Sequence, residues 1–499
     1  MGCHSIRKAI GGAVTAAFVA LLLPGTALAE RPLTYGEVLE GAIANNPTVG
    51  RADLTRDAAE AAVMGANGVF DPALRLNGNY GRSQSRGFFQ GFPFKSNSTS
   101  WDIGAGLTQT APTGTTISAQ TTLDRNLSTF TSEFGGLATT ETQQDFYTSN
   151  ANITISQQLL RGLTLSYNMQ TVTRAQDSLD IAELTLERTR QEVLGQAASA
   201  YWTWVYQDRV ATLAKESVDV AAEAARVGTL RVESGDLAPV ERTRLQAAVI
   251  QAQQNLLDAR IAAQQASDAV LLLIGEEPGQ AILPATSVDD VLLLELDSER
   301  AVEVAMSQNL DIAVAAAQVE RARADQRLAK HGQLPTLSAT AAAGIGSQQS
   351  TAAEAVGGLF GDESFPFVNI GGVFEVPLGN RAARAESMRS GVEVLQRELD
   401  LEETTRRVRS EVLVQVTRLE AAQRKVDLAE FQVRLAQETL DAEEALNEAG
   451  RAIQKDVLEA RQERDRLTSE SAKARTDWRI AQVDLLRLQG QLSGTDGMF

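Results

Sequence analysis

The stretch FDPALRLNGNYG, residues 70–81, reads as an Asp-Pro turn followed by a strand in which leucines alternate with small polar residues. The stretch QLPTLSATAAAG, residues 333–344, has the same form, and Pro72 aligns with Pro335 at the offset that relates the rest of the two stretches. A chain that contains the same turn and strand twice, far apart, is predicted to be an internal duplication.

The duplication extends along most of the chain. At the same offset Asn46 aligns with Asn309, and a later block aligns Gly235 with Gly450. The second block has a smaller offset because the first copy has a longer middle. We therefore predict five consecutive segments: a signal peptide (1–29), repeat 1 (30–275), a Pro/Gly-containing linker (276–297), repeat 2 (298–490) and a C-terminal tail (491–499).

The first 29 residues are typical of a secretory signal peptide. Arg7 and Lys8 precede an apolar run at 9–23, and small residues at Ala27 and Ala29 favour cleavage after Ala29. The apolar run is too short to span a membrane stably. The sequence therefore predicts export to the periplasm, the outer membrane or the exterior.

Composition argues against catalysis. The only cysteine, Cys3, leaves with the signal, and His331 is then the single histidine, which we interpret as the end of a helix before Gly332. Thiolate chemistry, disulfides and Cys/His metal sites are thereby excluded, and no carboxylate calcium loop is present. The net charge of −18 argues against binding to nucleic acid. We expect no enzyme activity, no metal and no cofactor.

Each repeat predicts the same order of helices around its strands. The return helices carry apolar residues, many of them alanine, at alternating steps of four and three, which is a coiled-coil seam. A long helix of about 60 residues matches a first helix and a return helix stacked end to end, so we expect a layered cylinder of helices. Charged runs such as RQERDR are expected on its solvated faces. The expected spans are 35–68 and 298–331 for the first helices, about 172–233 and 384–448 for the long helices, and return helices that end at Gly275 and Gly490.

The strands favour a membrane barrel. NANITISQQLL (150–160), SWDIGAGLTQTAP (100–112) and VNIGGVFEVP (368–377) each put apolar residues on one side, and the other side is largely small or polar. These strands are too few to close a barrel from one chain, so several chains would have to contribute. The polar segments 85–99 and 127–149 are predicted to be extracellular loops. The expected fold is mainly α, with strands contributed to a shared β-barrel.

With its duplicated helices and strands, the chain resembles the TolC family of outer-membrane efflux and secretion channels. The resemblance rests on LTYGEVLEGAIANNPTV at the mature start, SQQLLRG and FEVPLGNRAARAE before the long helices, the turns ESGDLAPVERTRLQA and EAGRAIQKDVLEARQ, and the closing LLLIG and LLRLQG. It implies a homotrimer in the outer membrane lipid with a periplasmic tunnel. It also implies a periplasmic adaptor (membrane fusion) protein and an inner-membrane transporter of RND, ABC or MFS type as partners.

The number of barrel strands stays open. The family norm of two strands per repeat gives twelve in a trimer, which the resemblance favours. Repeat 1 contains an extra candidate pair, however, at 100–112 and 115–126, joined by a Pro-Thr-Gly turn. This pair either joins the barrel, which then has eighteen strands, or caps it from outside.

The turns after the two long helices are the first candidate site. Gly235 and Gly450 lie where each long helix must reverse, a position that favours positive φ. The resemblance implies that these tips contact the adaptor, with Leu230 and Leu446 beside them.

An acidic pair is the second candidate site. The stretch DVLEA at 456–460 resembles the family's D-V-L-D-A stretch, which implies that Asp456 and Glu459 ring the closed entrance of the tunnel. At the matching positions of repeat 1, Glu241 and Arg244 cancel each other's charge. The alternative is that Asp456 caps the return helix and Glu459 complements its dipole.

The resulting hypothesis is a passive channel-tunnel of a tripartite efflux or type I secretion system that exports small molecules or proteins. The alternative, from another class, is a soluble periplasmic coiled-coil adaptor or scaffold. The sequence does not identify the cargo, because a duct open to water needs no pocket for it.

Overall fold

The computed structural model describes residues 31–89, 92–134, 137–235, 237–287, 298–449, 451 and 454–492. The predicted signal peptide, most of the linker and tail, and Gly450 lie outside the described residues. The chain divides into two compact units. Unit 1 comprises residues up to 51, 188–309 and those from 408, and unit 2 comprises 52–187 and 310–407.

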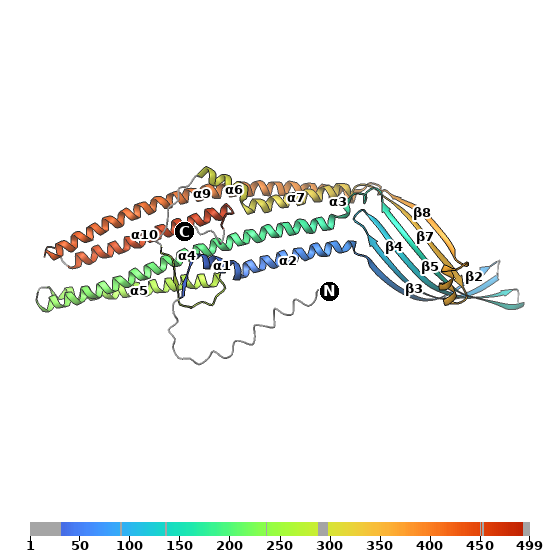
Figure 1. The fold of residues 1–499 in the computed structure, drawn as a ribbon, viewed down its shortest axis with the longest axis horizontal. Coiled ribbons are helices and arrows are strands. Elements are labelled where there is room, and N and C mark those ends of the chain that lie inside the picture. Colours follow the sequence, from blue (N-terminus) through green and yellow to red (C-terminus); the bar gives the residue numbers. More distant parts are fainter. Residues whose placement is uncertain are drawn as a thin grey trace, which may run out of the picture. The chain divides into compact units, whose positions relative to one another are not determined.

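The helices follow the predicted order in both repeats (Figure 1). Within the described part of the chain, no helix combines the length and apolar character needed to cross a membrane. Two of the helices are short: α3 (Leu165–Asn168) and α8 (Ala352–Gly357). The main helices are α1 (Tyr35–Asn45), α2 (Pro47–Asn67), α4 (Gln170–Glu233), α5 (Pro239–Leu273), α6 (Ser298–Gln308), α7 (Leu310–His331), α9 (Arg381–Glu448) and α10 (Gln454–Leu488).

The first helix of each repeat is two helices, so the prediction of one continuous helix is wrong. Asn46 has extended backbone angles between α1 and α2, as expected of a residue that precedes a proline. Its side-chain Nδ2 donates to the carbonyl oxygen of Leu273 at 3.2 Å, and Asn309 donates to that of Leu488 at 2.8 Å. Each break therefore ties the first helices of a repeat to the end of its return helix.

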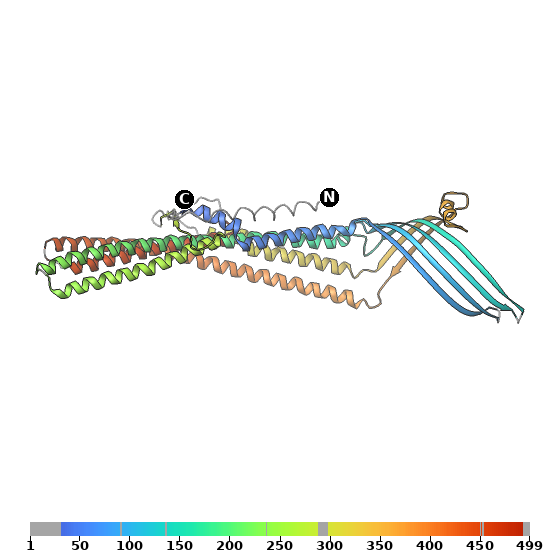
Figure 2. The same cartoon turned by 90° about the horizontal axis from the view of Figure 1, so that it is seen from below.

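The helices of unit 1 pack as two pairs. Figures 1 and 2 both show α4 beside α5 and α9 beside α10. Small residues allow the first pair to approach closely, since a Cβ at Gly228 would clash with Leu245. In the second pair Gln415 Nε2 donates to the carbonyl oxygen of Ala481 at 2.8 Å. Ala252, on the predicted seam of α5, is buried.

An aromatic cluster forms part of the unit 1 core. Tyr35 of α1 meets Tyr201 with ring centroids 5.4 Å apart, and its burial raises its pKa to about 12. Arg479 stacks over two of the tryptophans at 5.5 and 5.2 Å. Trp202 and Trp204 of α4 are therefore packed between helices. The largest rings, all at most 2% exposed, are Tyr201, Trp202, Trp204 and Trp478.

Unit 2 contains a six-stranded antiparallel sheet in the order β2-β3-β4-β5-β7-β8. In unit 1, β1 (Arg31–Leu33) pairs in parallel with β6 (Ile282–Pro284). The strands of the large sheet are β2 (Ala73–Phe89), β3 (Phe92–Thr110), β4 (Thr115–Phe134), β5 (Leu137–Gln158), β7 (Thr336–Gln349) and β8 (Phe365–Glu375).

The extra hairpin of repeat 1 belongs to this sheet. β3 pairs with β2 over the whole length of β2, and β4 pairs with β5. The hairpin is therefore part of the sheet and does not form a separate cap. Repeat 1 gives four strands and repeat 2 gives two. The family's two strands per repeat, which the resemblance favoured, is therefore wrong for repeat 1.

The predicted loops at 85–99 and 127–149 are largely strand. The β2–β3 ladder continues without a register shift from Ala73 to Phe89, and the β4–β5 ladder continues to Ser132 before its first irregularity. Backbone pairing continues there although serine, threonine and asparagine are frequent, because polar cross-strand pairs such as Gln84 and Asn97 also stabilise a ladder. Polarity was therefore a misleading sign of a loop.

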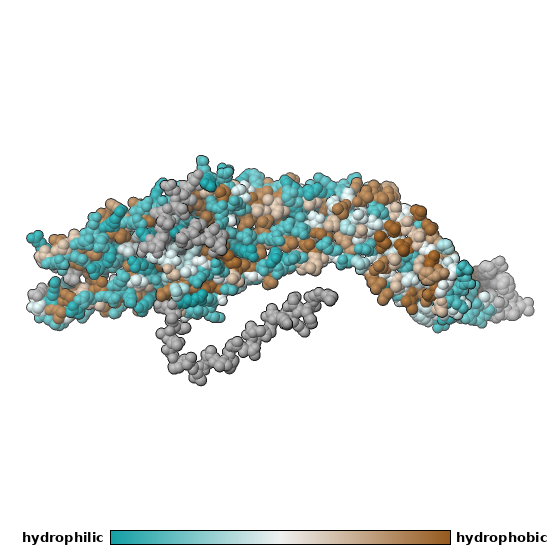
Figure 3. Space-filling model, viewed as in Figure 1, coloured by the Kyte–Doolittle hydropathy of each residue, from teal (hydrophilic) through white to brown (hydrophobic). Residues whose placement is uncertain are grey.

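The two faces of the sheet differ in chemistry. One row of directly paired residues runs Leu74, Leu107, Ala119, Ile153, Ala343 and Val368 across all six strands. We call this side the apolar face; apolar side chains gather over the sheet in Figure 3. The opposite, polar face carries residues such as Asp102, Asp124 and Asn152. An exposed apolar side opposite a polar one is typical of a membrane barrel wall.

Candidate functional site at the helical tips

The first tip reverses the chain between α4 and α5. Gly235 has φ +83°, so the expectation of a positive φ is confirmed. The Leu237 amide donates to the Arg231 carbonyl oxygen at 3.2 Å, and the Ser234 amide to that of Leu230 at 3.0 Å. These bonds satisfy carbonyl groups at the end of α4 and fix the turn. Leu230 is 53% exposed beside it.

The second tip lies between α9 and α10. The Arg451 amide donates to the Leu446 carbonyl oxygen at 2.8 Å, which closes the end of α9. Leu446 is 41% exposed. Gly450 lies outside the described residues, so its predicted positive φ stays a prediction. The two tips therefore share an exposed leucine near the end of the long helix.

The acidic pair of repeat 2, Asp456 and Glu459, has a basic neighbour in Lys455. Asp456 lies in the first turn of α10, which begins at Gln454, so it is inside the helix and not the cap that the alternative required. Glu459 accepts from Lys455 Nζ at 3.0 Å, and this hydrogen bond raises the pKa of Lys455. The sequence analysis missed Lys455, although its spacing of four from Glu459 is the usual signal of a helical ion pair.

The matching residues of repeat 1 form an ion pair with each other. Arg244 Nη1 lies 2.8 Å from Glu241 Oε1, as the predicted cancellation of charge requires. The positive charge of Arg244 opposes the rise in the pKa of Lys455 without reversing it. The acidic excess therefore belongs to repeat 2.

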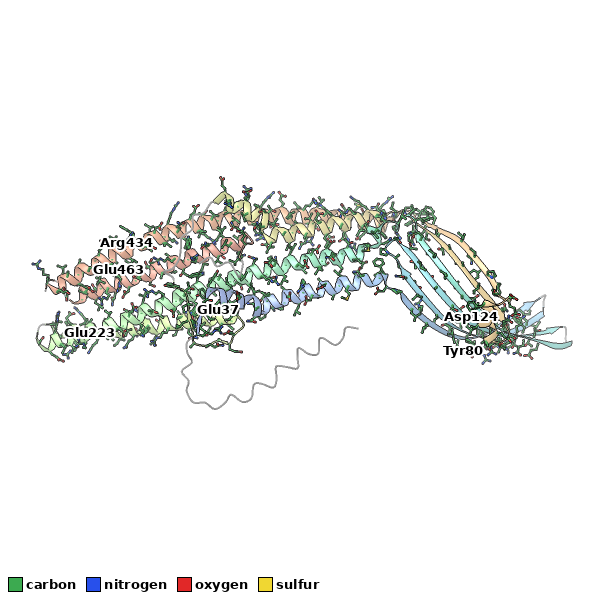
Figure 4. The ribbon with its side chains drawn as sticks, in the orientation of Figure 1. Glu37, Tyr80, Asp124, Glu223, Arg434 and Glu463 are labelled. Carbon is green, nitrogen blue, oxygen red and sulfur yellow. The ribbon has the colours of Figure 1, made fainter. Side chains whose placement is uncertain are left out.

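A groove of about 490 Å³ lies between α4, α9 and α10 close to these tips. Arg461 Nη2 approaches Glu444 Oε1 at 2.5 Å, and Arg226 binds Glu223 through both Nε and Nη2. Figure 4 shows Glu223 on α4. Sequence reasoning missed this groove because its lining comes from three helices. Its polar lining is mainly acidic: Asp219, Glu223, Glu444, Asn447, Glu448 and Arg461.

Side-chain clusters that could hold a metal ion are absent from the described part of the chain. No group of three or more His, Cys, Asp or Glu residues there is arranged to hold a metal ion. His331 ends α7, and its Nε2 donates to the Arg161 carbonyl oxygen at 2.8 Å. The interpretation of His331 as a helix C-terminal residue is confirmed.

Comparison with known proteins agrees with this architecture. The chain is 12% to 17% identical to solved outer membrane channels, and at this level the likeness shows the fold alone. For MtrE of Neisseria gonorrhoeae the identity is 17%, the TM-score 0.65 and the coverage 92% of this chain and 89% of that one. For CmeC of Campylobacter jejuni the identity is 13%, the TM-score 0.64 and the coverage 93% and 87%.

A curated relative matches a shorter stretch. The cobalt-zinc-cadmium resistance protein CzcC of Cupriavidus metallidurans is 26% identical over 160 residues, which are 30% of this chain. The match spans 38% of the length of that relative. The model of the family described as "Outer membrane efflux protein" matches residues 138–276 and 301–491, one stretch in each repeat. Because these stretches make up more than half of the chain, it belongs to the outer membrane efflux protein family, whose channels combine barrel strands with a periplasmic helical tunnel.

Proposed function

We propose that the protein is a passive export duct made of three copies, which share one β-barrel and one helical tunnel. The observation that carries this proposal is the open sheet. In the described chain β2 and β8 each pair on one side only, and their free edges would be unsatisfied in lipid. Six is an even number of strands, so β8 of one copy can pair antiparallel with β2 of the next. Three copies give eighteen strands.

The tips and the acidic groove support a periplasmic adaptor as partner. Leu230 and Leu446 are exposed apolar side chains at the tips, and the groove contributes carboxylates such as those of Asp219 and Glu448. A helical hairpin with apolar and basic side chains would fit this surface. An inner-membrane transporter would then supply the energy, since a duct has none of its own.

Asp456 and Glu459 are proposed to ring the tunnel entrance. Three copies would bring six carboxylates together, countered in part by three copies of Lys455. Such a ring attracts cations. The named function of the relative CzcC is resistance to cobalt, zinc and cadmium, so divalent metal ions are the proposed first cargo class.

One pair of experiments tests the duct. The purified protein is reconstituted in planar bilayers for single-channel recording, and its mass is measured by native mass spectrometry. A trimer with discrete conductance steps is expected. A soluble monomer without conductance would favour the periplasmic scaffold instead.

The cargo is tested separately. Deleting the gene from the host and measuring growth inhibition by cobalt, zinc and cadmium should reveal sensitivity that the gene restores. Unchanged tolerance to all three metals, together with normal conductance of the protein, would reject the cargo class and leave the duct standing.

A further inference from the structure

The outer part of the β2–β3 hairpin has an unusual charge. Residues 81–100 contain Arg82, Arg86 and Lys95 but no aspartate or glutamate, in a chain whose net charge is −18. All three side chains are exposed. A purely basic segment in an acidic chain indicates an anionic partner.

All three basic residues lie on the same side of the hairpin. Arg82 follows Tyr80 by two residues, Tyr80 pairs directly with Trp101, and Arg86 pairs directly with Lys95. Because directly paired residues and residues two apart share a face, these side chains continue the apolar face defined above. The carboxylates of Asp102 and Asp124, which pair with each other, lie on the opposite, polar face. Figure 4 labels Tyr80 and Asp124 on the sheet.

An aromatic row lies between these basic residues and the row of apolar residues that begins at Leu74. Trp101 and Tyr147 lie 6.0 Å apart, and Arg125 stacks over Tyr147 at 5.4 Å. Aromatic rows of membrane barrels lie at the level where hydrocarbon meets headgroups. Arg82 lies two residues beyond this row, which places it at headgroup level, and the directly paired Arg86 and Lys95 lie four residues further along the hairpin.

Among the side chains that the structure describes, two acidic residues of the neighbouring strands lie on this face, and neither is directly paired with the basic residues of the hairpin. Asp145 is held by Arg125 at 2.8 Å. Glu141 pairs with Thr131, which in turn pairs with Lys95, so it is two strands away from Lys95.

We propose that this outer side of the β2–β3 hairpin binds the phosphorylated headgroups of lipids in the outer leaflet, through Arg82, Arg86 and Lys95. The proposal rests on the outer-membrane location of the family. Guanidinium groups match phosphate oxygens in geometry, and the aromatic row holds the hairpin at the right depth. Each basic residue near an anionic membrane surface strengthens binding by about fivefold.

The test uses the full-length trimer in detergent with purified lipid A as the probe. Native mass spectrometry counts retained lipid A carrying two phosphates, lipid A carrying none, and inorganic phosphate alone. The variant Arg82→Gln/Arg86→Gln/Lys95→Gln is compared with wild type. The matched control is Arg75→Gln, since Arg75 is on the same strand but pairs with Gly106 on the polar face.

We expect wild type and the Arg75 control to prefer the bisphosphorylated lipid, and the triple variant to lose about 100-fold in affinity for it. Equal retention of both lipids by wild type would overturn the proposal, as would an unchanged triple variant. Binding of inorganic phosphate at the same strength would also overturn it, because the site would then be a simple anion site. If the triple variant does not assemble, the three single variants each have to show the smaller loss. Single-channel conductance of the variants stays normal if the duct is correct, so failure of the lipid site is distinguishable from failure of the duct.

Discussion

At the scale of single residues, charge at the start of α10 determines how the proposed entrance selects ions. The carboxylate of Glu459 forms an ion pair with the ammonium group of Lys455. Asp456 lies one turn earlier on the same helix. The pattern of acids was visible in the sequence because DVLEA follows a predicted turn. Lys455 directly precedes DVLEA, so a site defined by the carboxylates of that stretch does not include it.

The substitution Lys455→Gln should increase cation selectivity. Removing the ammonium leaves the carboxylate of Glu459 without its partner, so the entrance becomes more negative. The reversal potential in bilayers under a KCl gradient measures this change, with Lys473→Gln, an exposed lysine further along α10, as control. An unchanged reversal potential would mean that Lys455 and Glu459 lie away from the ion path.

Asp465 is an exception to the expectation that RQERDR lies on a solvated face, which holds for the exposed Gln462, Glu463 and Arg466 of the same run. Its side chain is only 18% exposed, and burial raises its pKa although Arg464 and Arg461 lower it. Burial depends on the neighbouring helices and was not visible in a run of charged residues.

Asp465→Asn is expected to stabilise the protein at pH 7. A folded-state pKa above the ordinary aspartate value of 3.8 favours the neutral carboxyl, so the free energy of unfolding falls as pH rises from 3.8 through the folded-state pKa. Asparagine removes this loss. Thermal unfolding followed by circular dichroism should give a higher midpoint for the variant at pH 7 and a similar midpoint below pH 3.8. A lower midpoint at pH 7 would show that the ion pair with Arg464 outweighs burial.

At the scale of elements, two asparagines determine where the first helices break. Pro47 is a local sequence signal for the first helix break. Asn309 is followed by leucine, so the second helix break has no such signal. The break there depends on the end of α10, whose Leu488 carbonyl oxygen accepts from Asn309. A tertiary hydrogen bond of this kind lies outside what periodicity can predict.

Replacing Asn46 and Asn309 by alanine should destabilise the protein by about 1 to 3 kcal/mol at each site, because a carbonyl group would lose its buried partner. Chemical denaturation of the double variant measures the loss. Asn67→Ala is the matched control, since Asn67 donates to the Val63 carbonyl oxygen in an exposed position. Equal effects of control and double variant would contradict a tertiary role for the two breaks.

Gly235→Val should abolish export while the trimer stays in the membrane. Nothing lies within 4 Å of a Cβ at Gly235, so the cost is conformational: valine resists the φ of +83° and distorts the tip. Gly279→Val is the control because Gly279 has φ +87°, also with no close neighbour. Export is measured by metal accumulation in cells, and assembly by membrane fractionation. Normal export by the Gly235 variant would mean that the partner does not need this turn.

At the scale of the whole molecule, the sequence predicted the duplication and the faces of the strands but not their partners. Alternation in β3 and β4 showed which side is apolar, and this holds equally for a wall strand and for a cap. Only the continuous pairing of β2 with β3, β3 with β4 and β4 with β5 distinguishes them. Pairing depends on residues far apart in the chain, which local patterns do not encode.

Deleting residues 93–133 should narrow the barrel by about a third, because barrel diameter grows roughly linearly with strand number. The deletion removes nearly all of β3 and β4 and leaves β2 and β5 joined by a short connection. Since β2 and β5 run in opposite directions in the sheet order, they can form an antiparallel pair directly. Three shortened copies would then build twelve strands where the full chain builds eighteen. Electron cryomicroscopy of both trimers measures the two diameters, and the image of the full-length trimer tests the count even if the shortened chain does not assemble. Equal diameters would place β3 and β4 outside the barrel wall, since a strand pair that bears on the circumference cannot be removed without shrinking it.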